Sequence, residues 1–167
     1  MKVNATGAKT SMIGGKLQPK FFDVYAQYLV KAMVAITKKL GQKPFQLSLQ
    51  NEPLNLPDTY PGNKMSPTDA VTIGEKVRQL LDKADLKETH LTAYDHNWDR
   101  PDFPVTVFDA TKAFSSVSWH CYAGTSDGQD TFSKAYPKVP MYMTECTRIT
   151  QYCECLRRLA HRAKQLC

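Results

Sequence analysis

Several features that would assign a protein class at once are missing from this 167-residue sequence. No stretch approaches the roughly 18 consecutive apolar residues that a membrane span needs. The opening segment, MKVNATGAKTSMIGGK, has no apolar core of the signal-peptide kind. There is also no internal repeat and no low-complexity linker. We therefore expect neither a membrane span nor a repeat protein, and the sequence leaves the localisation unknown.

The composition is that of a soluble globular domain, with 42% hydrophobic and 23% charged residues. The net charge of +6 is partly local, because four basic side chains fall in the final stretch: Arg157, Arg158, Arg162 and Lys164. A basic patch can bind nucleic acid, but aromatic residues usually interleave such a surface, and none do so here. A solvated helix face is the favoured interpretation, and no nucleic-acid partner is predicted.

The cysteine residues do not indicate a particular class of protein. The five residues are Cys121, Cys146, Cys153, Cys155 and Cys167. They show no Cys-x2-Cys or His-x3-His spacing of the kind that binds zinc, so no metal site is predicted from them. An odd count without a signal peptide favours free thiols over a disulfide framework.

Helical and strand-like patterns alternate along the chain. Helical patterns are predicted over 19–40, from Ser66 onward, over 105–114 and over 130–136; strands are predicted over 45–50, 89–94, 117–120 and 139–144. Strand–helix alternation at this spacing indicates parallel βα units and an α/β fold. Four strands are too few to close an eight-stranded barrel, so the chain is predicted to form a middle portion of one.

Polar residues gather where each predicted strand ends. Asn51 and Glu52 follow the first strand and Glu145 follows the fourth; between them stand Asp95, His96, His120 and Tyr122. The carboxyl ends of barrel strands form the active site of such folds. A lone glutamate there is most often a solvated charge. A pair of glutamates is nevertheless what enzymes that cleave glycosidic bonds use, with one carboxyl group protonated and the other ionised.

Aromatic residues near these strand ends could supply flat faces for sugar rings: Tyr60, Trp98, Trp119 and Tyr122. Five stretches then become recognisable together, in order and spacing: LSLQNEP (47–53), YPGNKMSP (60–67), AYDHNWDRP (93–101), SWHCY (118–122) and MYMTEC (141–146). They resemble glycoside hydrolase family 30 over residues 1–147, with the fungal endo-β-1,6-glucanase branch more similar than the glucosylceramidase branch.

The resemblance implies a (β/α)8 TIM barrel, of which this chain holds about strands 4 to 7, and hydrolysis of β-glycosides with retention. It implies Glu52 as the acid/base and Glu145 as the nucleophile. Substrate contacts are implied for Asn51, Tyr60, Asp95, His96, Trp98, His120 and Tyr122. No metal or organic cofactor is implied, Cys146 corresponds to a buried family cysteine, and the implied substrate is a β-linked glucan, with β-1,6-glucan favoured.

The resemblance ends after Thr147. Two regions are therefore predicted, a partial glycosidase barrel over 1–147 and a divergent, basic, Cys-rich helical tail over 148–167. A truncated barrel leaves two sheet edges without neighbours, and these are expected sites of self-association. The alternative function is a catalytically inactive fragment that acts as a carbohydrate-binding or interaction protein. Members of the family are mostly extracellular, but the sequence assigns this chain no location.

Overall fold

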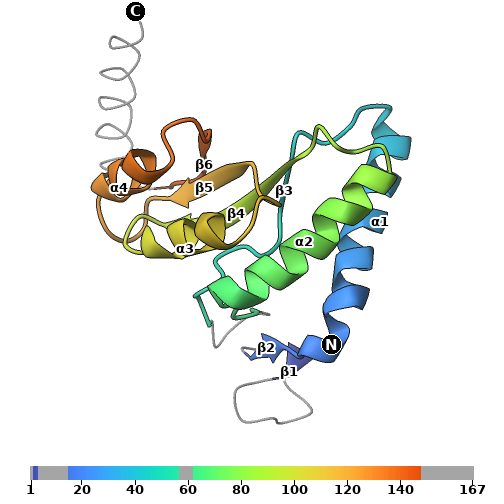
Figure 1. Cartoon of the computed structure of the whole chain (residues 1–167), viewed down its shortest axis with the longest axis horizontal. Helices are drawn as coiled ribbons and strands as arrows, with labels where there is room; N and C mark the ends of the chain where they lie inside the picture. The colour runs from blue at the N-terminus through green and yellow to red at the C-terminus, as the bar shows by residue number, and fades with distance from the viewer. Residues whose placement is uncertain (1, 4–14, 57–61, 148–167) are drawn as a thin grey trace, which may run out of the picture.

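A computed structural model describes residues 2–3, 15–56 and 62–147, and its arrangement is drawn in Figure 1. Two very short strands pair antiparallel near the start, β1 (Lys2–Val3) and β2 (Lys16–Leu17). The remaining elements alternate, as follows: a 3₁₀ turn η1 (Pro19–Phe21), α1 (Phe22–Leu40), β3 (Gln46–Ser48), α2 (Pro67–Lys83), β4 (His90–Asn97), α3 (Asp102–Ala110), β5 (Ser116–His120), α4 (Asp127–Ala135) and β6 (Met141–Glu145).

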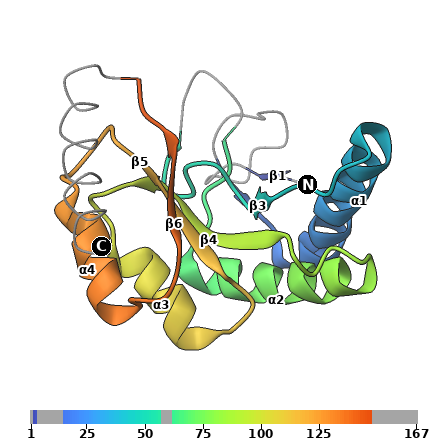
Figure 2. The same cartoon turned by 90° about the horizontal axis from the view of Figure 1, so that it is seen from above.

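The main sheet contains four strands in the order β3-β4-β5-β6, and every neighbouring pair is parallel. The helices lie together on one side of this sheet, which Figure 2 shows from above. Sequential parallel strands with helices packed on the same side are the repeating unit of a βα barrel. The predicted α/β fold, a partial barrel with parallel strands, is therefore confirmed.

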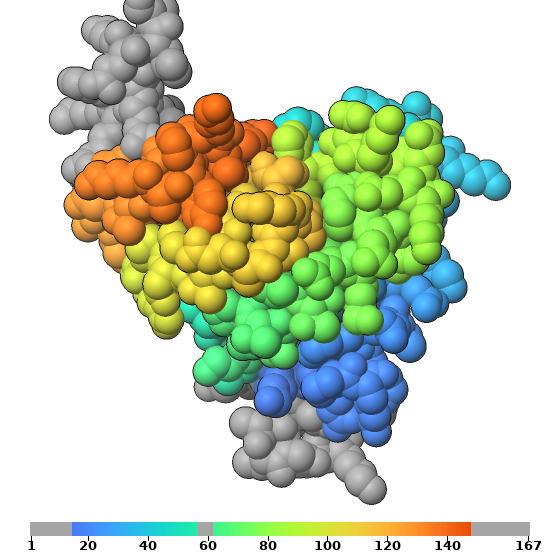
Figure 3. Space-filling view, viewed as in Figure 1, coloured from blue at the N-terminus to red at the C-terminus, as the bar shows by residue number. Residues whose placement is uncertain are grey.

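The face of the sheet that meets the helices is apolar. Leu91 of β4 and Val117 and Trp119 of β5 are completely buried on this side. The Trp119 ring stands edge-on to Tyr94, 5.5 Å away, and 6.3 Å from Phe132 of α4. Figure 3 shows α2, α3 and α4 forming one continuous outer surface over this core. Because successive side chains of a strand point to opposite faces, the residues between these apolar ones lie on the other face of the sheet.

The opposite face is polar. The Gln46 side-chain amide hydrogen-bonds to the hydroxyls of Thr92 and Ser118, and the Thr92 and Ser116 hydroxyls lie 2.6 Å apart. Nearer the amino ends of the strands, the Phe45, His90 and Tyr142 rings form an aromatic cluster. In a closed barrel this face points inward, with side chains stacked in layers. The residues of the candidate site form the layer above, at the carboxyl ends.

Several predicted boundaries are accurate because local chemistry decides them. Ser66 accepts a hydrogen bond from the Asp69 amide and Asp69 reaches back to the Ser66 amide, a capping box that starts α2. Gly41 ends α1 in the left-handed conformation, at φ 67°. The third helix begins at Asp102 rather than residue 105, because Pro104 lies within its first turn, where no amide donor is needed.

The strand β4 is longer than predicted. It runs to Asn97 instead of ending at Tyr94, and its register against β5 shifts between Thr92 and Asp95. Asp95 and His96 therefore lie within a strand and not in the loop that follows it. A bulge of this kind interrupts the regular alternation, so that Ala93 and Tyr94 both join the core while Asp95 returns to the polar face.

Some predictions fall outside the described residues. Tyr60 and the tail over 148–167 are among them, so the predicted helical tail stays a prediction. Within the described sheet β3 and β6 are the two edges, and self-association through them stays a prediction as well. None of the helices in the described part of the chain is long and apolar enough to cross a membrane.

Candidate active site

Four carboxyl-end positions of the sheet meet in one place. Glu52 lies in the loop after β3, Asp95 near the end of β4, His120 at the end of β5 and Glu145 at the end of β6. The Glu52 amide donates to the Asp95 carbonyl at 2.8 Å, which ties the first loop to the second strand. Glu52 has a left-handed backbone, with φ 48°. A non-glycine residue in that region costs energy and is found most often at functional sites.

His120 is the centre of this cluster. Its side chain is only 1% exposed, and its Nε2 lies 3.1 Å from Asp95 Oδ1. Its Nδ1 lies 3.3 Å from Glu52 Oε1 and 3.8 Å from Glu145 Oε2. One imidazole therefore touches both of the predicted catalytic carboxylates and a third carboxylate behind them.

The charges of His120 and Asp95 stabilise each other, as the directions of their pKa shifts indicate. Burial lowers the pKa of His120, but the hydrogen bond and charge of Asp95, with Glu52 and Glu145, outweigh it and raise the pKa above the ordinary value. Burial would raise the pKa of Asp95. Hydrogen bonds from His120, Thr144 and Ser48 more than offset that effect, so the pKa of Asp95 lies below its ordinary value. His120 and Asp95 thus form a buried ion pair over a broad pH range.

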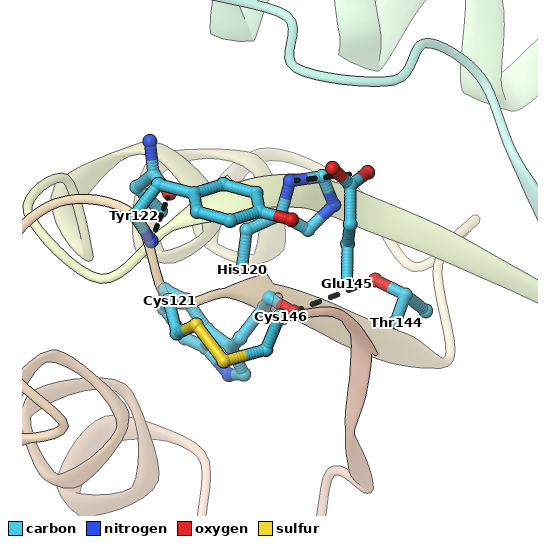
Figure 4. Close-up of a disulfide and its surroundings, with 8 residues drawn as sticks. His120, Cys121, Tyr122, Thr144, Glu145 and Cys146 are labelled. Carbon is cyan, nitrogen blue, oxygen red and sulfur yellow. Dashed lines mark hydrogen bonds and ion pairs between the residues drawn. A yellow bond between two sulfur atoms is a disulfide. The ribbon is translucent and has the colours of Figure 1, made fainter. Parts of the chain in front are cut away.

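A β-bulge brings Glu145 into the cluster. Trp119 pairs with Met143, but the register then shifts and His120 pairs with Glu145. Without the shift, His120 would face Thr144, and alternation would turn Glu145 to the other side of the sheet. With it, the Thr144 hydroxyl donates to Asp95 Oδ1 at 2.7 Å while Glu145 stays near His120. Figure 4 shows the Glu145 carboxylate directed toward the His120 ring.

The two predicted catalytic carboxylates differ in their surroundings. The Glu52 side chain is 14% exposed, whereas that of Glu145 is 45% exposed. Glu52 Oε2 accepts a 2.6 Å hydrogen bond from Asn55 Nδ2, and its Oε1 lies 3.8 Å from His96 Nδ1. Asn55 was not among the predicted site residues. Its position three residues after Glu52, in the tight loop that follows β3, was the available signal.

His96 lies beside Glu52 and His120 and is 9% exposed. Burial lowers the pKa of His96 below its usual value, although the Glu52 charge opposes this effect. Its Nδ1 is buried and has no hydrogen-bond partner among the described residues. The structure therefore brings His96 to the cluster, as a neutral and incompletely satisfied side chain.

A disulfide lies directly under the site. Cys121 and Cys146 are joined, with Cα atoms 5.2 Å apart, and each follows a site residue, His120 or Glu145. Figure 4 shows the bridge beneath those two side chains. The expectation of free thiols is wrong for this pair, because parallel strands 25 residues apart in sequence bring the two cysteines side by side. The bridge fixes the carboxyl ends of β5 and β6 relative to each other.

Tyr122 stands at the same edge, partly buried. Its ring centroid is 6.1 Å from that of His120, and its amide donates to Asn97 Oδ1 at 3.0 Å. Asn97, the last residue of β4, was not predicted as a site residue. Its amide side chain connects the loops after β4 and β5, and its place beside His96 in AYDHNWDRP was the signal for it.

Other predicted residues lie away from the cluster. Asn51 is exposed beside Glu52. Trp98 is only 5% exposed, and its backbone packs against Gly124 and Gly128. Trp119 is completely buried under the helices, and its suggested role as a face for sugar rings is wrong. Tyr60 lies outside the described residues.

The fold and the site together define a class. A parallel βα sheet with two carboxylates at the carboxyl ends of its strands, bridged by a buried histidine, is the architecture of a barrel hydrolase that uses a carboxylate pair. Comparisons with known proteins agree with this class. No protein-family model matches the chain.

Two fungal proteins are similar in sequence. An endo-1,6-beta-D-glucanase of Neurospora crassa is 35% identical over 150 residues, which cover 87% of this chain and 31% of that protein. The endo-1,6-beta-D-glucanase BGN16.3 of Trichoderma harzianum is 41% identical over 131 residues, or 76% of this chain and 26% of that one. The chain thus spans about a third or less of the length of the relatives that it matches.

Solved structures agree in fold. An endo-beta1,6-glucanase superimposes with a TM-score of 0.76 at 25% identity, over 86% of this chain and 34% of the other. A glycoside hydrolase family 30 xylanase from Clostridium acetobutylicum superimposes with a TM-score of 0.55 at 18% identity, over 78% of this chain and 32% of the other. The predicted resemblance to endo-β-1,6-glucanases is therefore confirmed, and the fold is shared with a glycoside hydrolase family 30 structure.

Proposed function

We propose that this chain supplies both catalytic carboxylates of a retaining β-glycoside hydrolase acting on β-1,6-linked glucan, with Glu52 as acid/base and Glu145 as nucleophile. The observation that carries the proposal is the shared contact of both carboxylates with His120 Nδ1. The relatives' names, endo-1,6-beta-D-glucanase, support the substrate class.

The geometry supports retention. The distances from His120 Nδ1, 3.3 Å to Glu52 Oε1 and 3.8 Å to Glu145 Oε2, put an upper limit of about 7.1 Å on the separation of those two oxygens. Carboxyl groups in retaining enzymes lie about 5–5.5 Å apart, and those in inverting enzymes about 6.5–9.5 Å apart, leaving room for a water. The limit accommodates the retaining spacing and overlaps only the lower end of the inverting range, from about 6.5 to 7.1 Å.

The mechanism follows from these positions. In the first step the ionised Glu145 oxygen bonds to the anomeric carbon as the bond from that carbon to the glycosidic oxygen breaks. The protonated Glu52 carboxyl gives its proton to the departing oxygen, which leaves as a hydroxyl of the remaining glucan. In the second, Glu52 removes a proton from water, which attacks the same carbon and releases Glu145.

His120 and Asp95 have a positioning role in this scheme. The imidazolium, held by Asp95 from behind, lies 3.3 Å from Glu52 Oε1 and 3.8 Å from Glu145 Oε2. It orients the Glu52 carboxyl group and places a positive charge beside the Glu145 carboxylate. Thr144 and Asn55 complete the hydrogen bonds of Asp95 and Glu52. The remaining predicted contacts with substrate, by Asn51, Tyr60, His96, Trp98 and Tyr122, stay predictions.

The stereochemistry of the product tests this proposal. A chimaera in which residues 45–147 replace the aligned segment of the Neurospora crassa relative gives the four strands a complete barrel. The first-formed product of β-1,6-glucan hydrolysis, observed by proton NMR before mutarotation, is expected to be the β anomer. An α anomer, or a cooperatively folding chimaera without hydrolysis, would contradict the proposal. Sugar binding without hydrolysis would instead favour the inactive-fragment alternative.

We also propose that the protein works in an oxidising, extracellular compartment. The Cys121–Cys146 bridge supports this, since structural disulfides persist mainly in secreted proteins. Non-reducing peptide mapping of the protein from culture medium should recover the two cysteines in one linked pair of peptides. Alkylation of both thiols without prior reduction would contradict it.

A further inference from the structure

Three potential metal ligands surround one point at the mouth of the sheet. Glu52, His96 and His120 each direct one donor atom there, and all three atoms lie within 4.8 Å of one another. Glu52 Oε1 is 3.3 Å from His120 Nδ1 and 3.8 Å from His96 Nδ1. Donors at about 2.0–2.1 Å from a tetrahedral zinc ion stand roughly 3.3–3.4 Å apart. The Glu52–His120 separation already matches, the Glu52–His96 separation needs to close by about 0.5 Å, and the two imidazole donors need to close by at most about 1.5 Å.

His96 has an unused donor that points into this cluster. Its side chain is buried, and its Nδ1 has no hydrogen-bond partner among the described residues. A buried polar atom without a partner is costly, and in native structures it calls for an explanation such as an ion. The same nitrogen is the atom that lies 3.8 Å from Glu52. An ion between them would satisfy it.

His120 has a hydrogen-bond partner of the kind that metal-binding histidines have. Metal-ligating imidazoles almost always donate through their other nitrogen to a carboxylate, a backbone carbonyl or a water, which fixes the ring and raises its basicity. His120 directs Nδ1 to the cluster, while its Nε2 contacts Asp95 at 3.1 Å. Asp95 is fixed in turn by Thr144 at 2.7 Å. The carboxylate–histidine arrangement is therefore already in place.

We propose that Glu52, His96 and His120 form a binding site for a zinc-like divalent transition-metal ion, which displaces the Nδ1 proton of the His120 imidazolium into solvent when it binds. Two imidazoles and one carboxylate favour zinc, nickel or copper over magnesium, which prefers oxygen ligands. The bound ion occupies the carboxylate that the proposed mechanism uses as acid/base, so it inhibits the enzyme rather than assisting it. The inhibition rests on the proposed function, whereas the binding does not depend on it.

Calorimetric titration of the full 167-residue chain with Zn²⁺ alone tests the binding. Cys153, Cys155 and Cys167 are replaced by serine in every protein compared, so that their thiols cannot bind the ion. The site variant is His96→Ala, and the matched control is His90→Ala, six residues earlier on the same strand and outside the cluster. His96→Gln, which keeps a polar group at the buried position, is measured in parallel in case alanine prevents folding.

We expect one Zn²⁺ per chain at the cluster, with Mg²⁺ binding at least a hundredfold more weakly. The His96 variant that retains the wild-type unfolding transition should bind Zn²⁺ at least tenfold more weakly, and His90→Ala should bind as the parent does. Equal affinity in the His96 and His90 variants, or no preference for Zn²⁺ over Mg²⁺ in the parent, would overturn the site. Because no substrate is used, failure here is distinct from failure of the proposed hydrolase.

Discussion

Replacing either Glu52 or Glu145 by glutamine is expected to lower kcat/KM for β-1,6-glucan by at least about 10³-fold in the completed barrel. Glutamine has nearly the same shape but can neither donate a proton as an acid nor form the glycosyl ester. General acid–base catalysis by one positioned group is worth about 10²–10⁴-fold, and loss of a nucleophile removes the covalent route altogether. Steady-state hydrolysis by the chimaera and its variants measures both effects.

The matched control is Glu88→Gln, an exposed glutamate at the opposite end of the sheet, just before β4. It should leave kcat/KM unchanged. The unfolding temperature of all three variants should stay close to that of the parent, because neither Glu52 nor Glu145 belongs to the apolar core. Activity within tenfold of the parent in either catalytic variant would contradict the assignment of that glutamate.

Replacing His120 by glutamine is expected to destabilise the fold strongly, and more at mildly acidic than at alkaline pH. His120 is buried against three carboxylates, and removing one partner of a buried ion pair costs about 3–5 kcal/mol. Glutamine leaves the Asp95 charge without a counter-charge in the protein interior. Chemical denaturation of the 167-residue chain across a pH series measures the difference.

The pH dependence follows from the two shifts. The pKa of His120 is raised, so its contribution to stability is complete below its ordinary value of 6.5 and is lost as pH rises through the higher folded value. The pKa of Asp95 is lowered, so its contribution is present above its ordinary value of 3.8 and is lost as pH falls through the lower folded value. The cost of His120→Gln should therefore be largest between about pH 4 and pH 6.5.

His90→Gln is the control for this experiment, since His90 contacts Ser115 and no carboxylate. It should change the unfolding free energy little, and equally at pH 5.5 and pH 9. A loss in His120→Gln that is the same at both pH values would show that the side chain acts through packing alone.

The sequence predicts the layout of the site because parallel strands bring their carboxyl ends to one edge. Glu52, His120 and Glu145 each lie at or just after the end of a strand-like run, so the strand order alone predicts that they fall at one edge of the sheet. The five motifs then restrict the class further. The start of α2 and the end of α1 were also predictable, because the capping residues and the glycine act within a few residues of the chain.

Other parts of the site depend on long-range geometry that no local pattern encodes. The bulge that places Glu145 opposite His120 is a property of two paired strands, and so is the shift that returns Asp95 to the polar face. The Cys121–Cys146 bridge depends on the same pairing of β5 with β6. The number of cysteines contains no information on this pairing, and for that reason it favoured free thiols. Tryptophan is a residue type that can pack against sugar rings, so the sequence suggested this role for Trp98 and Trp119. The structure buries both side chains.

Azide rescue distinguishes directly between the roles of Glu145 as nucleophile and Glu52 as acid/base. Glu145→Gly and Glu52→Gly chimaeras are given azide and an activated aryl glycoside of β-1,6-linked glucose. In Glu145→Gly, azide takes the place of the missing nucleophile, and the expected product is the glycosyl azide of inverted, α configuration. In Glu52→Gly, azide attacks the glycosyl–Glu145 ester and the expected product has the β configuration. Products of the same configuration from both variants would contradict these two roles. A β product from Glu145→Gly with an α product from Glu52→Gly would also contradict them.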